Sequence, residues 1–196
     1  KNNSHALPLD LSAPVALFGR VQKNYFYVGN GSGGDVSAPY NINLVQGLVN
    51  AGVQLDSTVL AAYESWCTAS VNDPDPGFWG HWPRYYAEMP VKQDWVQAAA
   101  KRCQTAVVVI GRSAGEDREN TLKKGSFYLT NKEKALLDAV TTAFQKVVLV
   151  LNIGSIMDFA EIDAYGDKIS AILLAWQLGM ESGNAVADVL TGQVNP

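Results

Sequence analysis

The 196-residue sequence lacks several features that would indicate particular partners. It has no run of lysine or arginine, and its 15 basic and 19 acidic residues give a net charge of -4, which argues against binding along a phosphate backbone. No stretch approaches about eighteen uninterrupted apolar residues, and residues 1–5 lack the charged-then-apolar pattern of a signal peptide. We therefore expect a soluble protein that binds neither nucleic acid nor membrane, with the cytoplasm slightly favoured.

Thiols and imidazoles are also scarce. The two cysteines, Cys67 and Cys103, lack the spacing of metal ligands, and so few thiols in a chain of this length favour buried, reduced residues over disulfides. The two histidines, His5 and His81, are too few to support a metal centre or a Ser–His pair. We expect no metal and no cofactor, and we interpret His81 as a loop residue.

The sequence does contain short apolar runs that alternate with amphipathic segments. Continuous apolar runs of this kind are typical of strands that a parallel sheet buries on both faces. The predicted strands are 15–18, 106–110, 147–151 and 169–175, and the predicted helices are 40–50, 91–103 and 130–145, the last beginning at a capping box of Thr130 and Glu133. The pattern predicts a three-layer α/β sandwich, a mostly parallel sheet with helices on both faces, in one domain over 1–196.

The glycine-rich stretch 28–35 reads VGNGSGGD and matches the G-x-G-x-x-G pattern of dinucleotide-binding loops. Asp56 follows at about the distance expected of a ribose-binding carboxylate. Against this interpretation, Pro39 places the next helix start several residues after Gly34, away from the phosphate position. Nucleotide binding remains an alternative, which a shift of the melting temperature by NAD or ATP would reveal, and a tight turn without a ligand is another.

A polar, charged segment at 112–120 follows the predicted strand 106–110. In open α/β sheets the loops beyond the carboxyl ends of strands build the site, so this position favours a function. A solvated loop without a chemical role is the alternative, since most charge clusters only face water. Position in the sequence does not decide between the two.

An ordered series of fragments resembles the second domain of glycoside hydrolase family 3, the β-glucosidase type. The fragments are LPL at 7–9, ALFG at 16–19, GSGGDV at 31–36, GRSAGE at 111–116, GSFYL at 125–129, VLVLNIG at 148–154, AWQLGMESG at 175–183 and AVADVLTGQVNP at 185–196. They cover essentially the whole chain, and their order and spacing are more specific than any one of them. The resemblance implies that the chain is a domain excised from a longer protein with an N-terminal TIM-like barrel.

The resemblance also implies a site that acts on β-glycosides. It implies that Ser32 contacts the sugar, that Glu116 is the general acid/base of a retaining glycosidase, and that the attacking aspartate lies on the barrel. Glu119 is the alternative acid/base, because this loop varies in the family. We expect desolvation and a nearby carboxylate to raise the pKa of Glu116, as an acid catalyst requires.

Three further interpretations remain open at this point. The aromatic residues between Trp79 and Tyr86 either stack on a sugar beyond the scissile bond or pack against the barrel. We assign Glu181 and Asn184 to a helix start and to packing. A noncatalytic carbohydrate-binding or structural module would be favoured if the longer protein kept its rate after removal of Glu116.

Overall fold

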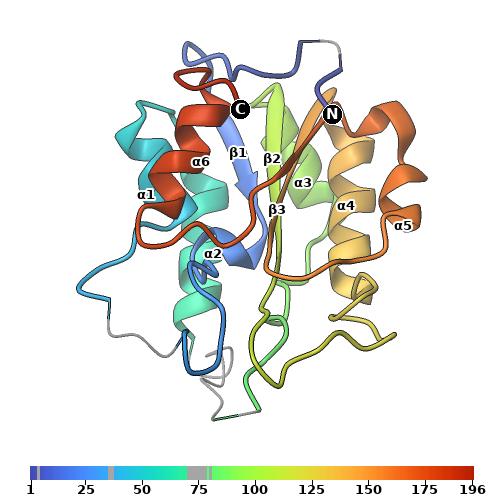
Figure 1. Cartoon of the computed structure of the whole chain (residues 1–196). Helices are drawn as coiled ribbons and strands as arrows, with labels where there is room; N and C mark the ends of the chain where they lie inside the picture. The colour runs from blue at the N-terminus through green and yellow to red at the C-terminus, as the bar shows by residue number, and fades with distance from the viewer. Residues whose placement is uncertain (4, 35–37, 70–78, 80) are drawn as a thin grey trace.

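A four-stranded parallel sheet forms the centre of the molecule in the computed structural model (Figure 1). The strands are β1 (Val15–Phe18), β2 (Thr105–Arg112), β3 (Lys146–Ile153) and β4 (Ala171–Leu174), and they lie side by side in sequence order. β2 and β3 pair along their whole length, from Thr105 opposite Lys146 to Arg112 opposite Ile153. The structure describes residues 1–3, 5–34, 38–69, 79 and 81–196; Asp35 and Val36 of the glycine-rich fragment lie outside these residues.

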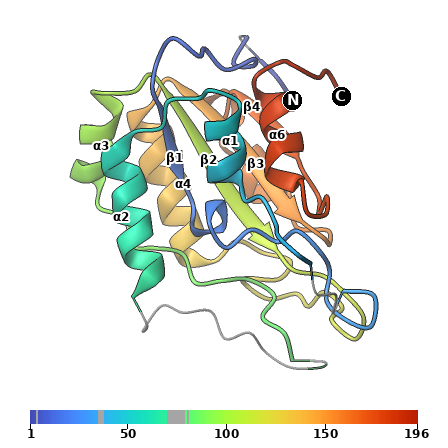
Figure 2. The ribbon, with the colours of Figure 1, turned by 90° about the vertical axis from the view of Figure 1, so that its left-hand side faces the viewer.

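Helices cover both faces of the sheet, which confirms the predicted fold class (Figure 2). One face packs against α2 (Ser57–Thr68), α3 (Gln93–Ala100), α4 (Asn131–Ala143) and α5 (Ala160–Asp163), and the other packs against α1 (Leu44–Asn50) and α6 (Ser182–Leu190). Successive strand residues point to opposite faces of the sheet. Val108 packs in the core on the side of α2 to α5, and Val109 packs in the core on the side of α1 and α6. Burial on both faces explains why the strands are continuous apolar runs.

Side-chain caps mark the starts of α1, α2 and α4. Thr130 and Glu133 form the predicted capping box at the start of α4. α1 begins at Leu44 rather than at residue 40, because Asn43 and Gln46 form a second capping box there. α2 was not among the predicted helices; the carboxylate of Asp56 caps its first turn by accepting a hydrogen bond from the backbone N–H of Val59.

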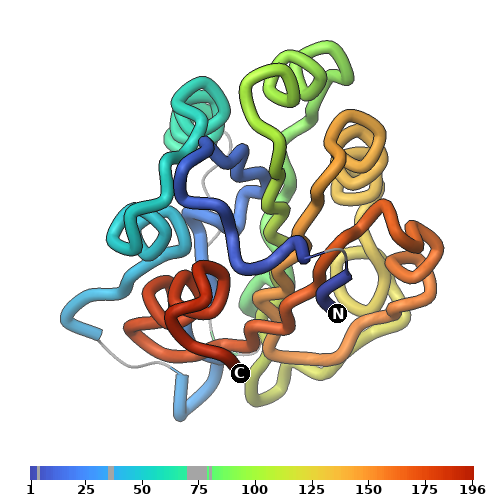
Figure 3. Tube along the Cα trace, turned by 90° about the horizontal axis from the view of Figure 1, so that it is seen from above, coloured from blue at the N-terminus to red at the C-terminus, as the bar shows by residue number. Residues whose placement is uncertain are grey.

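All four strands point the same way, so the loops that follow them meet at one end of the sheet, the lower end in Figure 1. The loop after β1 carries Ser32, and the loop after β2 carries Glu116. The two chain ends lie at the opposite end of the sheet (Figure 3). Lys1 and Pro196 both line one groove there. The fold therefore separates the two chain ends from the loops in which a site is expected.

Candidate active site

The glycine-rich loop after β1 is joined to the loop after β2 by backbone hydrogen bonds. The N–H of Asn30 donates to the carbonyl of Ala114 over 2.7 Å, and the N–H of Glu116 donates to the carbonyl of Asn30 over 3.2 Å. Asn30 and Gly115 thus form an isolated parallel bridge beyond the sheet proper. This bridge holds the two loops at a fixed register, one against the other.

The two residues expected at the site, Ser32 and Glu116, are in direct contact. Both the hydroxyl and the backbone N–H of Ser32 donate to the same oxygen, Oε2 of Glu116, over 2.7 and 3.0 Å. Both residues are exposed at the carboxyl end of the sheet. The structure thus brings the two predicted site residues together. Their roles toward a sugar stay predictions.

The pKa of Glu116 is shifted in the direction opposite to the expected one. The hydroxyl of Ser32, and after it the backbone N–H of Ser32, lower the pKa of Glu116 below its usual value, and desolvation opposes them only weakly. The expected rise of this pKa is therefore wrong for this chain by itself. The physical reason is that Glu116 is exposed and accepts two hydrogen bonds that favour its charged form.

Glu119, the alternative acid/base, lies farther along the same loop. Its backbone carbonyl accepts two hydrogen bonds from the guanidinium group of Arg84, over 2.9 and 3.2 Å. The hydroxyl of Ser32 lies against Glu116 instead. The geometry thus pairs the expected sugar-contact residue with Glu116.

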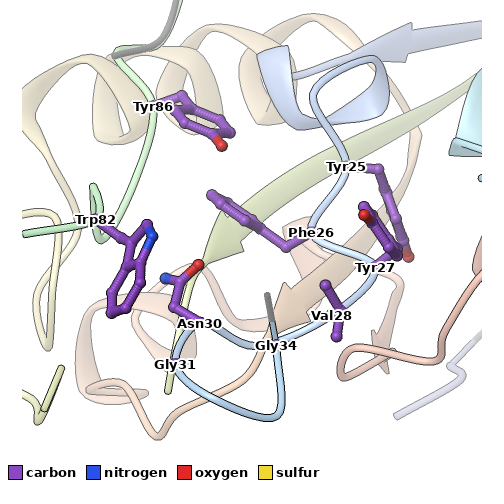
Figure 4. Close-up of a pocket in the computed structure, with 9 residues that line it drawn as sticks. All are labelled: Tyr25, Phe26, Tyr27, Val28, Asn30, Gly31, Gly34, Trp82 and Tyr86. Carbon is purple, nitrogen blue, oxygen red and sulfur yellow. The ribbon is translucent and has the colours of Figure 1, made fainter. Parts of the chain in front are cut away.

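A cavity of about 250 Å³ lies beside the glycine-rich loop (Figure 4). It is lined by Tyr25, Phe26, Tyr27, Val28, Asn30, Gly31, Gly34, Trp82 and Tyr86. The Phe26 and Tyr86 rings stack with centroids 4.7 Å apart, and the side chain of Asn30 projects between Trp82 and Phe26. The hydroxyl of Tyr25 and the amide nitrogen of Asn30 are buried with no hydrogen-bond partner among the described residues.

The aromatic segment borders this cavity from one side. Trp82 and Tyr86 line it, and exposed Trp79 meets Trp82 edge to face with centroids 5.3 Å apart. Residues 70–78 and 80 lie outside the described residues. An aromatic contact with a sugar beyond the scissile bond stays a prediction.

The carboxylate expected in a nucleotide site is at the wrong end of the sheet. The backbone of Asp56 is hydrogen-bonded to Val15, the first residue of β1, whereas the glycine-rich loop follows the last. The side chain of Asp56 is also occupied by α2 and by the guanidinium group of Arg102, over 2.6 and 3.0 Å. The interpretation of Asp56 as a ribose ligand is therefore wrong. Its spacing from the glycine-rich loop along the chain is a coincidence.

The remaining expectations concern packing and composition. Glu181 precedes α6 and accepts hydrogen bonds from Tyr40 and Asn184, in agreement with the assignment of Glu181 and Asn184 to a helix start and packing. Cys67 and Cys103 are buried and free. Within the described ranges, no group of three or more potential ligand side chains is placed to hold a metal ion, and no helix is long and apolar enough to cross a membrane.

Sequence reasoning missed the buried ion pair that supports the Glu116 loop. Both guanidinium Nη atoms of Arg112, the last residue of β2, donate to the carboxylate of Glu133, over 2.6 and 2.8 Å. The Nε of Arg112 also donates to the carbonyl of Ser126, farther along the same loop. The available signal was an arginine at the end of an apolar strand, where an unpaired charge would be costly to bury.

Comparison with known proteins places the chain in a family. Residues 1–196 match the model of the glycosyl hydrolase family 3 C-terminal domain. A β-glucosidase of Ruminococcus albus is 40% identical over 99% of this chain, and β-glucosidase A of Butyrivibrio fibrisolvens is 32% identical over all of it. The crystal structure of a β-glucosidase from Paenibacillus barengoltzii superposes with a TM-score of 0.93 at 36% identity, covering 99% of this chain. The chain spans only 20%, 26% and 21% of these three proteins, respectively.

Proposed function

Because the chain belongs to glycosyl hydrolase family 3, as the C-terminal domain, we propose that it completes the active site of a retaining β-glycosidase. Glu116 is the general acid/base in this proposal, and Ser32 contacts the sugar. The nucleophilic carboxylate comes from an N-terminal TIM-like barrel of the same longer protein. The observation that carries the proposal is the direct contact of Ser32 with Glu116 at the carboxyl end of the sheet.

The chemistry requires a carboxyl group that changes its protonation state twice. In the first step Glu116 gives its proton to the departing glycosidic oxygen, while the nucleophile from the other domain bonds to the anomeric carbon. In the second step the Glu116 carboxylate takes a proton from water, which attacks that carbon and releases the nucleophile. A glutamate that is exposed on a surface loop can serve both steps.

The lowered pKa of Glu116 in this chain is compatible with the proposal. An acid catalyst must hold its proton near neutral pH, so its pKa has to rise when the site is assembled. Two changes would raise it: exclusion of water by the second domain, and the negative charge of the nucleophile nearby. Transfer of the Ser32 hydroxyl from Glu116 to a sugar oxygen would add to the rise, because it removes a donor that favours the carboxylate.

Exposed apolar side chains support the docking of a second domain at this end of the sheet. Trp176, Leu178 and Met180 are all exposed and lie on the segment that follows β4. The backbone N–H of Gly179 in that segment donates to the carbonyl of Tyr27, close to the glycine-rich loop. Covering these side chains would bury apolar surface and exclude water from the site in one event.

The substrates proposed are glycosides with terminal β-linked glucose or a related sugar, the class indicated by the names of the relatives. The polar atoms of Tyr25 and Asn30 and the ring of Trp82 suit a hydroxylated ligand with apolar ring faces. A noncatalytic binding module is the second candidate for the chain. It would be supported by full activity of the longer enzyme without Glu116.

The deciding experiment compares leaving groups in the longer enzyme. Glu116→Ala should slow cleavage of a disaccharide by about 100-fold or more, because the poor leaving group needs the proton. Cleavage of dinitrophenyl glucoside to the covalent intermediate should be far less affected, since its leaving group needs none. Glu119→Ala in the same loop is the matched control and should show neither effect. The reverse pattern would make Glu119 the acid/base, and unchanged rates in both variants would overturn the proposal.

A further inference from the structure

One buried side-chain amide near the site hydrogen-bonds to two of the loops at this end of the sheet. Asn152 lies on β3, one residue before its end, and is fully buried. Its Oδ1 accepts a hydrogen bond from the backbone N–H of Phe26 over 2.8 Å. Its Nδ2 donates to the carbonyl of Phe26 over 2.8 Å and to the carbonyl of Trp176 over 2.7 Å. Both amide hydrogens and the amide oxygen are therefore used.

These three bonds join loops that follow different strands. Phe26 lies in the loop after β1, Trp176 lies in the loop after β4, and Asn152 is on β3 itself. The two bonds to Phe26 reproduce the donor and acceptor pattern of a neighbouring strand residue, so the side chain acts as a short extension of the sheet. Where the backbone ladder ends, one amide thus holds the two loops in place.

The segment held by Asn152 leads directly to the candidate acid/base. Beyond Phe26, the carbonyl of Tyr27 accepts from Gly179 in the β4 loop, and Asn30 bridges to Gly115 in the β2 loop. Two residues later, Ser32 donates twice to Glu116. Segment 26–30 is therefore fixed on both sides, and among the described residues its only side-chain hydrogen bonds to the sheet are those with the amide of Asn152.

We propose that Asn152 is a positioning residue, which sets the contact between Ser32 and Glu116 by fixing Phe26 and Trp176 at the end of the sheet. It touches neither of the reacting groups. Without its amide, three backbone groups lose their partner, the two of Phe26 in a buried place and that of Trp176 in a partly buried one, and segment 26–30 has to move to regain hydrogen bonds. The catalytic consequence rests on the proposed function of Glu116.

The contact can be followed in the 196-residue chain through the titration of Glu116, by NMR of its carboxyl carbon. Loss of a Ser32 donor should raise the pKa of Glu116 toward its usual value, so Ser32→Ala, which removes the hydroxyl and keeps the backbone N–H, provides the reference for loss of the larger contribution. Asn152→Leu, which has a similar branched shape but no amide, should displace both donors and raise the pKa of Glu116 at least as far as Ser32→Ala does. If this variant fails to fold, Asn152→Asp serves instead, because its carboxylate keeps an acceptor for Phe26 and loses both donors.

Val150→Ala is the matched control, since Val150 lies two residues earlier on the same face of β3 and is equally buried. It should lower the melting temperature while Glu116 titrates as in the wild type. A wild-type titration of Glu116 in the Asn152 variant would overturn the proposal, as would an equal shift in Val150→Ala.

The catalytic part of the proposal is measured in the longer enzyme. Asn152→Leu should lower kcat/KM for a disaccharide on the order of 10- to 100-fold, as misplacement of a catalytic group does, and should affect dinitrophenyl glucoside much less. Equal losses on both substrates would contradict a role through Glu116. Full activity of Glu116→Ala would instead overturn the proposed function and leave the titration result for Asn152 intact, so the two failures are distinguishable.

Discussion

A β-carbon on Gly31 would lie 2.5 Å from the Cβ of Glu116. Gly31 also has a backbone φ of +104°, which residues other than glycine rarely adopt. We expect Gly31→Ala to destabilise the chain by about 1–3 kcal/mol and to separate Ser32 from Glu116. Denaturant unfolding and the titration of Glu116 would measure both effects. Gly33→Ala is the control, because a β-carbon there meets no atom within 4 Å; equal behaviour of the two variants would refute the crowding argument.

Ser32 should contribute to transition-state binding in the longer enzyme. Ser32→Val removes the hydroxyl, so a polar partner is left unmet, and kcat/KM should fall by the equivalent of about 1–3 kcal/mol. Ser32→Thr retains a hydroxyl and should recover part of the loss. An unchanged kcat/KM in Ser32→Val would remove Ser32 from the sugar site.

Azide should rescue the Glu116→Ala enzyme on an activated substrate. With dinitrophenyl glucoside the covalent intermediate should accumulate, because the base that activates water is missing. Azide needs no base, so it should restore turnover and give a glycosyl azide of retained configuration, which mass spectrometry and NMR would identify. Rescue of Glu119→Ala in place of Glu116→Ala would transfer the role to Glu119. If neither variant responds, the acid/base lies elsewhere.

The 196-residue chain alone should hydrolyse no aryl β-glycoside. An isolated general acid cannot form the covalent intermediate that the missing nucleophile provides. The assay is release of nitrophenol by the purified chain, with Glu116→Ala as the background control. Turnover that exceeds this background would show that the chain contains its own nucleophile.

The stability of the chain should fall as the pH rises toward neutrality, because of Glu88. Burial is the main cause that raises the pKa of Glu88 to about 7. It does so although the carboxyl group accepts hydrogen bonds from the backbone N–H groups of Arg20 and Met89 and from the hydroxyl of Tyr63. The folded state therefore holds a proton that the unfolded state has lost above about pH 4.5. The contribution is complete below that pH and is lost as the pH passes through 7, on the order of 3 kcal/mol in total.

Urea unfolding between pH 4 and 8 would measure this dependence. Glu88→Gln cannot titrate, so its free energy of unfolding should vary less over the same interval, whatever its absolute value. An identical pH dependence in the two proteins would assign the effect to other groups.

The layers of this fold could be predicted from sequence because each strand is buried on both faces and appears as an unbroken apolar run. β4 is shorter than its apolar run: Ile169 and Ala175 are buried too, but they lie outside the strand, which covers Ala171–Leu174. α2 was missed, although Val59, Tyr63 and Cys67 are its buried residues and recur every four positions. That spacing is the helical signal that would have found it.

The site was less accessible to sequence reasoning. The pattern of strands predicted which loops meet, but only the family resemblance selected Ser32 and Glu116 from among their neighbours. Spacing misled at Asp56, because distance along the chain does not tell at which end of a sheet a residue lies. The contact between Asn152 and Phe26 spans 126 residues, and no local pattern encodes such a pair.

The strand order β1-β2-β3-β4 has a consequence for the protein during its synthesis. Each new strand can add to the edge left by the one before it, so the sheet can grow while the ribosome is still translating. The loop after β1 has to wait, since Phe26 meets Asn152 only after 126 further residues, and Trp176 comes later still. At about 5–20 residues per second this delay is roughly 6–25 seconds. Within this domain, the Ser32 loop is thus made well before the residues that hold it in place.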